Sequence, residues 1–420
     1  MATADAMLEM ALLGLLTGVL TGAVMLLFRA AIELPLDAAL PGTGGEHFER
    51  LAPTMRAVLV IGGALLVGLG MHRLRDERRS VGVVHVIEMT ERHRGRLPWQ
   101  NAAVQFLGGA MALLTGQSGG REGPAIHLGA AVGSLGGQCL DLPDNSMRTL
   151  VACGTAAAIA GSFNTPVAGV VFEMEVVLTE YTITSFVPVI LAAVASTLVS
   201  QAVFGDHTAF VVPEGIRIRS LIEYPIVAAE GVYIGGLASA FLAVVERVTR
   251  LPLAAPWQRI AAAGLATGCV SLVLPQVMGI GYGSVELALV GAAPIGLLAV
   301  VGIAKLFVSA LVYGLRVPVG VIGPTLVIGA CAGAAFGAVG HVLTPHLASD
   351  LGIYVMLGMG AMMAAVLQAP LAALIAVVEL TGTPSVTLPA MLAIVVATIT
   401  VSSVFKQRSV FVAMLEARAS

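Results

Sequence analysis

Long apolar stretches that are almost free of charge are the feature that most constrains how this chain folds. The clearest of them cover residues 8–32, 55–71, 97–116, 183–204, 226–245 and 386–405. About 20 apolar residues in a helix cross the hydrocarbon core of a bilayer. The chain of 420 residues has only 11% charged residues, whereas a soluble domain carries roughly 25%. We therefore expect an all-α, polytopic membrane protein with the lipid bilayer as its solvent.

Arginines gather between two of these stretches and indicate the orientation of the chain. They are Arg73, Arg75, Arg78, Arg79, Arg92, Arg94 and Arg96. Such clusters mark cytoplasmic loops, and nothing supports a nucleic-acid partner. The four cysteines are far apart and show no spacing typical of a metal site or a disulfide framework. We expect no metal and no cofactor.

An internal duplication organises the chain. Residues 120–133 read GREGPAIHLGAAVG, and residues 320–333 read GVIGPTLVIGACAG, at an offset of 200. A second pair, residues 154–175 and 358–379, follows in the same order and ends on Glu175 and Glu379. We expect a first membrane repeat over 1–210, a second over 211–405, and a C-terminal segment, 406–420, that contributes to a central site. Transporters often consist of inverted repeats whose broken helices meet near the bilayer midplane.

Each glycine–proline segment of the duplication predicts an anion site. A glycine-bearing loop precedes a new helix that we expect to begin at Pro124 in the first repeat and at Pro324 in the second. The first turn of a helix offers unpaired N–H groups and the positive end of its dipole. Backbone donors bind an anion without a full charge at membrane depth, where full charges are costly.

Glu122 lies at the first of these helix starts and has two interpretations. It is a capping carboxylate stabilised by the helix dipole, or it is a tethered anion that competes with a transported one and swings away from the site. An ionisable residue at membrane depth favours the functional interpretation.

These motifs resemble those of the CLC family of chloride channels and anion/proton antiporters. GREGP at 120–124 looks like one family signature, KLFVSALVYGLRVPVGVIGP at 305–324 is similar to a second, and AGSFNTPVAGVVFEMEV at 160–176 resembles a third. The resemblance implies a helical fold of two inverted repeats, a homodimer with one pore per subunit, and a bacterial-type member without cytoplasmic regulatory domains. It places the protein in the cell inner membrane as a multi-pass protein.

The resemblance also implies the site residues. Glu122 takes the position of the external gating glutamate. The implied anion-binding residues are Val81, Gly82, Val83, Gly120, Arg121, Glu122, Gly123, Gly320, Val321, Ile322, Gly323 and Phe411.

Three of these positions depart from the family pattern. The family's first anion loop carries a serine where Val81 stands, and a tyrosine near the C-terminus is replaced by Phe411. Both side-chain hydroxyls of the central site are therefore missing. The usual phenylalanine of the second signature is replaced by the smaller Ile322.

The inner proton-relay position also differs. Antiporters of the family carry two consecutive glutamates there, whereas this chain has Glu175 followed by Val176. An aliphatic side chain cannot relay a proton. Glu173 is two residues earlier and faces another side of the helix, and Glu175 is interpreted as structural because Glu379 repeats it.

We expect transport of a small monovalent anion, chloride or bicarbonate, without proton coupling. Bicarbonate is larger than chloride and brings its own hydroxyl donor, which suits a site without hydroxyls. The alternatives are a conventional chloride channel or chloride/proton antiporter, and a fluoride- or nitrate-selective variant. An intramembrane enzyme is remote because no HExxH metal-ligand motif occurs, and a cation carrier would favour carboxylates at the broken helices. We assign no role to His85 or His127, and leave Lys305 as either a donor to carbonyls or a charge that biases the pore.

Overall fold

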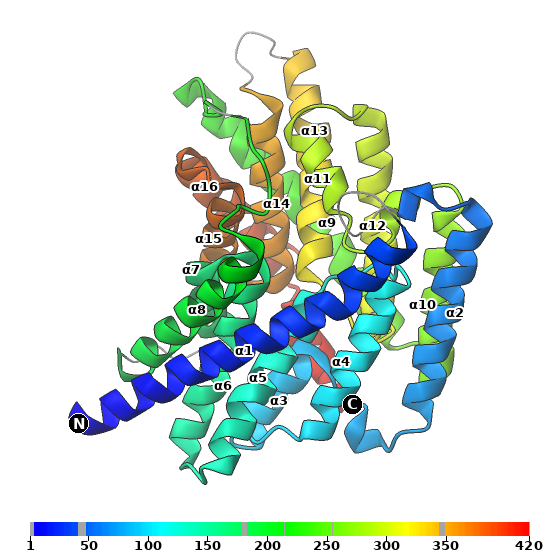
Figure 1. The fold of residues 1–420 in the computed structure, drawn as a ribbon. Helices are drawn as coiled ribbons and strands as arrows, with labels where there is room; N and C mark the ends of the chain where they lie inside the picture. The colour runs from blue at the N-terminus through cyan, green and yellow to red at the C-terminus, as the bar shows by residue number, and fades with distance from the viewer. Residues whose placement is uncertain are drawn as a thin grey trace.

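The computed structural model describes residues 4–40, 48–178, 183–213, 215–253, 255–343 and 349–419. The elements that these residues form are all helices, so the all-α expectation is confirmed for the described part of the chain (Figure 1). The first half of the chain contains α1 (Ala4–Ala39), α2 (Pro53–His72), α3 (Gly82–Arg92), α4 (Trp99–Leu114), α5 (Glu122–Cys139), α6 (Asp144–Phe163), α7 (Pro166–Phe172) and α8 (Ile183–Phe204). The second contains α9 (Tyr224–Thr249), α10 (Pro256–Ser271), α11 (Tyr282–Leu289), α12 (Ile295–Gly314), α13 (Ile322–Leu343), α14 (Leu351–Leu367), α15 (Pro370–Thr381), α16 (Thr387–Ile399) and α17 (Val410–Ala419).

Seven helices in the described residues are long and apolar enough to cross a bilayer. They lie at Met7–Ala39, Pro53–His72, Ser185–Phe204, Leu221–Thr249, Ile295–Gly314, Ile322–Leu343 and Pro384–Val404. Two of them, α12 and α13, were not among the clearest apolar stretches. The stretch 97–116 forms α4, whose 16 residues are shorter than a full span.

Glycines bring the helices of each half into close contact, as small residues do in membranes. A Cβ on Gly129 of α5 would lie 2.2 Å from the carbonyl oxygen of Gly154 in α6. At the matching positions of the second half, a Cβ on Gly329 of α13 would lie 2.2 Å from the carbonyl oxygen of Gly358 in α14. The α5–α6 and α13–α14 pairs thus pack backbone to backbone at matching positions of the two halves.

The linker between α8 and α9, at residues 205–223, separates the two groups of helices. In Figure 1, α1 crosses the front of the molecule past α5, α6 and α8, while α2 and α10 pair at the right-hand edge. The interior where α5 and α13 begin is therefore enclosed by helices from both groups.

Candidate functional site

The two glycine–proline segments meet in the interior although 200 residues separate them. Gly120 N–H donates to the carbonyl oxygen of Gly320 at 2.8 Å, and Gly320 N–H donates to that of Gly120 at 2.6 Å. This pair forms an isolated antiparallel bridge, and each of its residues lies two positions before the first residue of α5 or α13. The bridge places both helix starts, and therefore both sets of first-turn N–H groups, at one point.

The helices begin two residues earlier than the prolines suggested. The first helical residues are Glu122 and Ile322, so Pro124 and Pro324 occupy the third position of the first turn. Proline is tolerated there because N–H groups of the first turn have no partner within the helix. Gly123 and Gly323 consequently lie inside the first turns, whereas Gly120 and Gly320 lie in the preceding loops.

The carboxylate of Glu122 occupies the space that these glycines leave. The residue is 2% exposed. A Cβ added to Gly120 would lie 1.7 Å from Oε2 of Glu122, and one added to Gly320 would lie 2.6 Å from the same oxygen. A Cβ on Gly323 would lie 2.5 Å from Oε1. The carboxylate is therefore seated between the two broken helices, in contact with both repeats.

Two cavities flank this carboxylate. A small one of about 30 Å³ is lined by Glu122 together with Phe172, Tyr282 and Ile322. A larger one of about 540 Å³ is lined by Arg121 and also by Tyr282. Tyr282 lines both cavities, so the two cavities approach each other at this residue.

Val81, Gly82 and Val83 lie elsewhere, along a separate cavity of about 440 Å³. The N–H of Gly82 donates to Oε1 of Gln105 at 2.7 Å, and Nε2 of Gln105 donates to the carbonyl oxygen of Pro318 at 3.1 Å. The sequence interpretation missed this glutamine. The available signal was the amide of Gln105 in the middle of the apolar stretch 97–116, and this residue is fully buried in the structure.

Phe411 is the second residue of α17, and it is 2% exposed. Its ring meets that of Phe172 edge to face, with centroids 6.5 Å apart. Because Phe172 lines the small cavity beside Glu122, Phe411 lies one aromatic ring away from that cavity. The structure thus brings Glu122 and Ile322 to one cavity, places Phe411 behind it, and leaves Val81 at another.

Glu175 and Glu379 cap helices of the opposite repeat. Glu175 accepts hydrogen bonds from the N–H groups of Leu371 and Ala372 at 3.2 and 2.8 Å, at the start of α15. Glu379 accepts from the two matching N–H groups at the start of α7, at 3.0 and 2.8 Å. The structural interpretation of Glu175 fits these contacts, since its carboxylate is already engaged by two donors.

The residues around Glu175 form a π-helical turn over Glu173–Leu178 that continues α7. Val176 is half-buried within it. Glu173 is fully buried, and neither of its carboxylate oxygens has a hydrogen-bond partner among the described residues. Glu173 and Glu175 therefore occupy different surroundings, as their spacing predicted.

Three buried polar residues have partners that the sequence did not reveal. Nδ1 of His85 and Nε2 of His127 lie 2.8 Å apart, and their rings stack with centroids 5.1 Å apart. The Nζ of Lys305 donates to the carbonyl oxygens of Val277 and Gly279 at 3.1 and 2.9 Å. Lys305 thus fixes the loop before α11, which agrees with the carbonyl-donor interpretation.

Comparison with known proteins finds similarity to chloride channels and chloride exchangers. A family model described as voltage-gated chloride channel matches residues 63–402. The H(+)/Cl(−) exchange transporter ClcA of Vibrio cholerae is 27% identical over 394 residues, which are 90% of this chain and 83% of that protein. A putative chloride channel protein, ClcB-like, of Ralstonia nicotianae is 31% identical over 355 residues, 82% of each chain.

Solved structures show the same fold. The crystal structure of a slow cyanobacterial Cl−/H+ antiporter superposes with a TM-score of 0.84 at 24% identity and covers 97% of both chains. A CLC-type fluoride/proton antiporter superposes with a TM-score of 0.79 at 23% identity, covering 95% of this chain and 96% of its own.

Proposed function

Since the chain belongs to the voltage-gated chloride channel family, and is therefore a membrane protein of anion transport and not an enzyme, we propose that it carries bicarbonate or chloride through a pathway gated by Glu122. The observation that supports this most strongly is the seat of the Glu122 carboxylate between the starts of α5 and α13. A negative group held there competes with a mobile anion for the same helix-start field.

The proposed pathway runs from the cavity at Arg121, past Tyr282 and Glu122, toward Phe411 and then the cavity at Val81. Its implied ligands are the backbone groups and side chains of Val81, Gly82, Val83, Gly120, Arg121, Gly123, Gly320, Val321, Ile322, Gly323 and Phe411. The N–H of Gly82 is less available to an anion than the others, because it already donates to Oε1 of Gln105. We propose that the first loop contributes less to the anion than the two glycine–proline segments do.

We propose that transport is not coupled to protons. Val176 cannot relay a proton, and both oxygens of Glu175 accept helix-start N–H groups. The relatives from Vibrio and Ralstonia are named a proton/chloride exchanger and a chloride channel, respectively. Conventional chloride/proton antiport is therefore the second candidate, and buried Glu173 is the carboxylate that would serve it.

Bicarbonate is proposed beside chloride because Val81 and Phe411 replace the two side chains whose hydroxyls contact the central ion in the family pattern. Hydrogen bonds to charged groups contribute about 1.5–3 kcal/mol each, so losing two weakens chloride binding substantially. Bicarbonate compensates in part, because its own hydroxyl donates a hydrogen bond to a backbone carbonyl, and Ile322 leaves more room beside Glu122 than phenylalanine would.

The wider arrangement is also part of the proposal. We propose repeats over 1–210 and 211–405, with 406–420 completing the central site, in a homodimer in the cell inner membrane. Reciprocal capping by Glu175 and Glu379 supports the division into repeats, because each repeat completes a helix start of the other. Cross-linking in native membranes tests the homodimer.

A liposome flux series tests the proposed function. Liposomes that contain the purified protein are loaded with bicarbonate, chloride, nitrate or fluoride. In a parallel series, sodium is exchanged for potassium. We expect rates to follow the anion and to ignore the cation. Glu122→Gln changes the rate and its dependence on outer pH, whereas Glu91→Gln, an exposed change on α3, leaves both as they were.

Two results contradict parts of the proposal separately. Flux that follows the cation overturns anion transport. A sustained pH change driven by a chloride gradient, in vesicles without bicarbonate, overturns the absence of proton coupling and leaves anion transport standing.

A further inference from the structure

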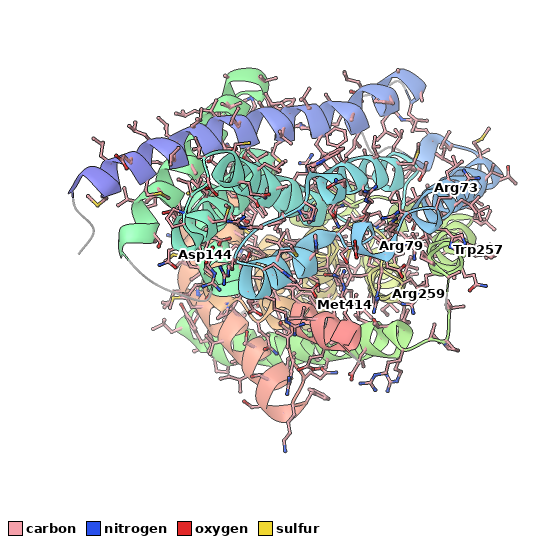
Figure 2. The ribbon with its side chains drawn as sticks, turned by 90° about the horizontal axis from the view of Figure 1, so that it is seen from below. Arg73, Arg79, Asp144, Trp257, Arg259 and Met414 are labelled. Atoms are coloured by element: carbon pink, nitrogen blue, oxygen red, sulfur yellow. The ribbon has the colours of Figure 1, made fainter. Side chains whose placement is uncertain are left out.

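Four arginines from separate parts of the chain surround the 440 Å³ cavity at Val81. Arg79 precedes α3, Arg259 lies in α10, Arg316 lies between α12 and α13, and Arg418 lies near the end of α17. Figure 2 shows Arg79 and Arg259 facing the same region, with Met414 beside it. The sequence cluster at 73–96 contributes only one of the four, so the cavity is not simply part of the basic loop.

The acidic residues at this cavity do not balance the arginines. Asp76 pairs with Arg79, and Oε2 of Glu88 lies 3.7 Å from Nη1 of Arg418. Arg259 and Arg316 have no acidic partner among the described residues. The lining therefore has four positive and two negative side chains, a net charge of 4 − 2 = +2.

Backbone carbonyls hold the two unpaired guanidinium groups in place. Nε of Arg259 donates to the carbonyl oxygen of Leu253 at 2.7 Å, and Nη2 of Arg316 donates to that of Ala417 at 3.2 Å. Burial, together with the nearby charges of Arg418 and Arg259, lowers the pKa of Arg316 to about 10. Arg316 still carries its charge at neutral pH, so Arg259 and Arg316 keep like charges close together with no acidic partner of their own among the described residues.

Arg316 adopts a backbone conformation that favours glycine. Its φ is +63°, in the left-handed region, where a residue with a Cβ is strained. The matching residue of the first repeat, 200 positions earlier, is Gly116 with φ +84°. A glycine would fit this turn without strain, so the arginine places a guanidinium group at the cavity at a conformational cost. Strained residues of this kind concentrate at functional sites.

We propose that this cavity, at the arginine-side entrance of the proposed pathway, binds a phosphate group of a multivalent anion. Several guanidinium groups around one cavity suit a tetrahedral oxyanion with two negative charges, because each offers paired N–H donors in a fixed plane. A small monovalent ion would neutralise only half of the net charge of +2. The phosphate belongs to a soluble anion or to a lipid headgroup.

Occupancy also has a consequence for transport, and this step rests on the proposed function. Val81, Gly82 and Val319 line the same cavity, so a bound phosphate lies across the arginine-side entrance of the proposed pathway. A phosphate compound on that side then inhibits anion flux.

Binding is tested without measuring transport. Detergent-purified full-length protein is titrated with inorganic pyrophosphate, and affinity and melting temperature are recorded. We expect saturable binding and a raised melting temperature for the natural sequence and for Arg73→Gln, an exposed arginine outside the cavity. Arg259→Gln and Arg316→Gly each weaken binding at least tenfold. Arg316→Gly melts no lower than the natural protein in phosphate-free buffer, because glycine relieves the turn.

A second arm separates the two sources of phosphate. The same variants are reconstituted in vesicles of phosphatidylcholine alone or with added phosphatidic acid. Stabilisation by pyrophosphate assigns a soluble anion, and stabilisation only by phosphatidic acid, lost in Arg316→Gly, assigns a lipid. The proposal is overturned if neither compound binds, or if Arg316→Gly and Arg73→Gln bind alike. Either result leaves the flux measurements, and hence the proposed function, untouched.

Discussion

Replacing Gly120 with alanine should expel the Glu122 carboxylate without disturbing the backbone around it. The three atoms nearest to a Cβ at Gly120 all belong to the Glu122 side chain, with Oε2 at 1.7 Å, Cδ at 2.5 Å and Oε1 at 2.7 Å. Real Cβ contacts essentially never fall below 3.0 Å, so Oε2 must retreat by at least 3.0 − 1.7 = 1.3 Å. Only the far end of a flexible side chain has to move.

Displacement of this carboxylate removes a competitor for the anion site. A charge at a helix N-terminus gains up to about 2 kcal/mol in a partly buried geometry, and 1.4 kcal/mol corresponds to about a tenfold change in occupancy. We therefore expect Gly120→Ala to raise anion flux about tenfold at neutral pH and to reduce its dependence on outer pH. In a Glu122→Ala background, the same change should have almost no effect.

Liposome flux and thermal melting together check this reasoning. Gly136→Ala is the matched control, because it adds the same methyl group to α5 where a Cβ has nothing within 4 Å. Gly320→Ala should instead lower the melting temperature, since its Cβ would lie 2.5 Å from the backbone nitrogen of Gly123. If Gly120→Ala is stable but carries anions with the wild-type rate and pH dependence, the carboxylate does not block the pathway.

Three further changes test other contacts. Glu175→Ala and Glu379→Ala should each lower the free energy of unfolding by about 2 kcal/mol, a value that already allows for the partial exposure of the two carboxylates. Thermal melting in detergent measures this loss, and an unchanged melting temperature would contradict the capping role. Lys305→Met should cost about 2–4 kcal/mol because it leaves two buried carbonyl oxygens without a donor, and a melting temperature equal to wild type would count against this. Val81→Ser combined with Phe411→Tyr should shift the ratio of bicarbonate to chloride flux toward chloride by tenfold or more. A natural protein that already carries chloride well and rejects bicarbonate would refute the retuned site.

The fold was largely predictable because the strongest signals are local or repeated along the chain. Apolar length predicted the spanning helices, and the matched glycine–proline segments predicted that corresponding pieces would meet. The boundary errors have simple causes. Proline marks the first turn but not its first residue, so both helix starts were placed two residues late. The stretch 97–116 was read as a span although α4 ends at Leu114, before the loop that leads to Glu122.

The site was predictable only where its residues fall in a motif. The position of the Glu122 carboxylate could be anticipated because the glycines around it are its sequence neighbours or their repeats. The contact between His85 and His127 could not, because it depends on the packing of α3 against α5. The same holds for Gln105 at Gly82 and for Arg316, whose left-handed turn is visible only as a departure from Gly116 once the backbone is known.

Reciprocal capping by Glu175 and Glu379 has a consequence for the synthesis of the chain. The N–H groups at the start of α7 receive their acceptor from Glu379, which lies 211 residues beyond Ala168. At about 5–20 residues per second, a ribosome needs roughly 10–40 s to reach that glutamate. Throughout this interval the first half is in the bilayer with a helix start uncapped, and it completes its own fold only when the second half arrives. The two halves therefore mature as one unit, and an N-terminal fragment that stops before Glu379 lacks part of its own structure.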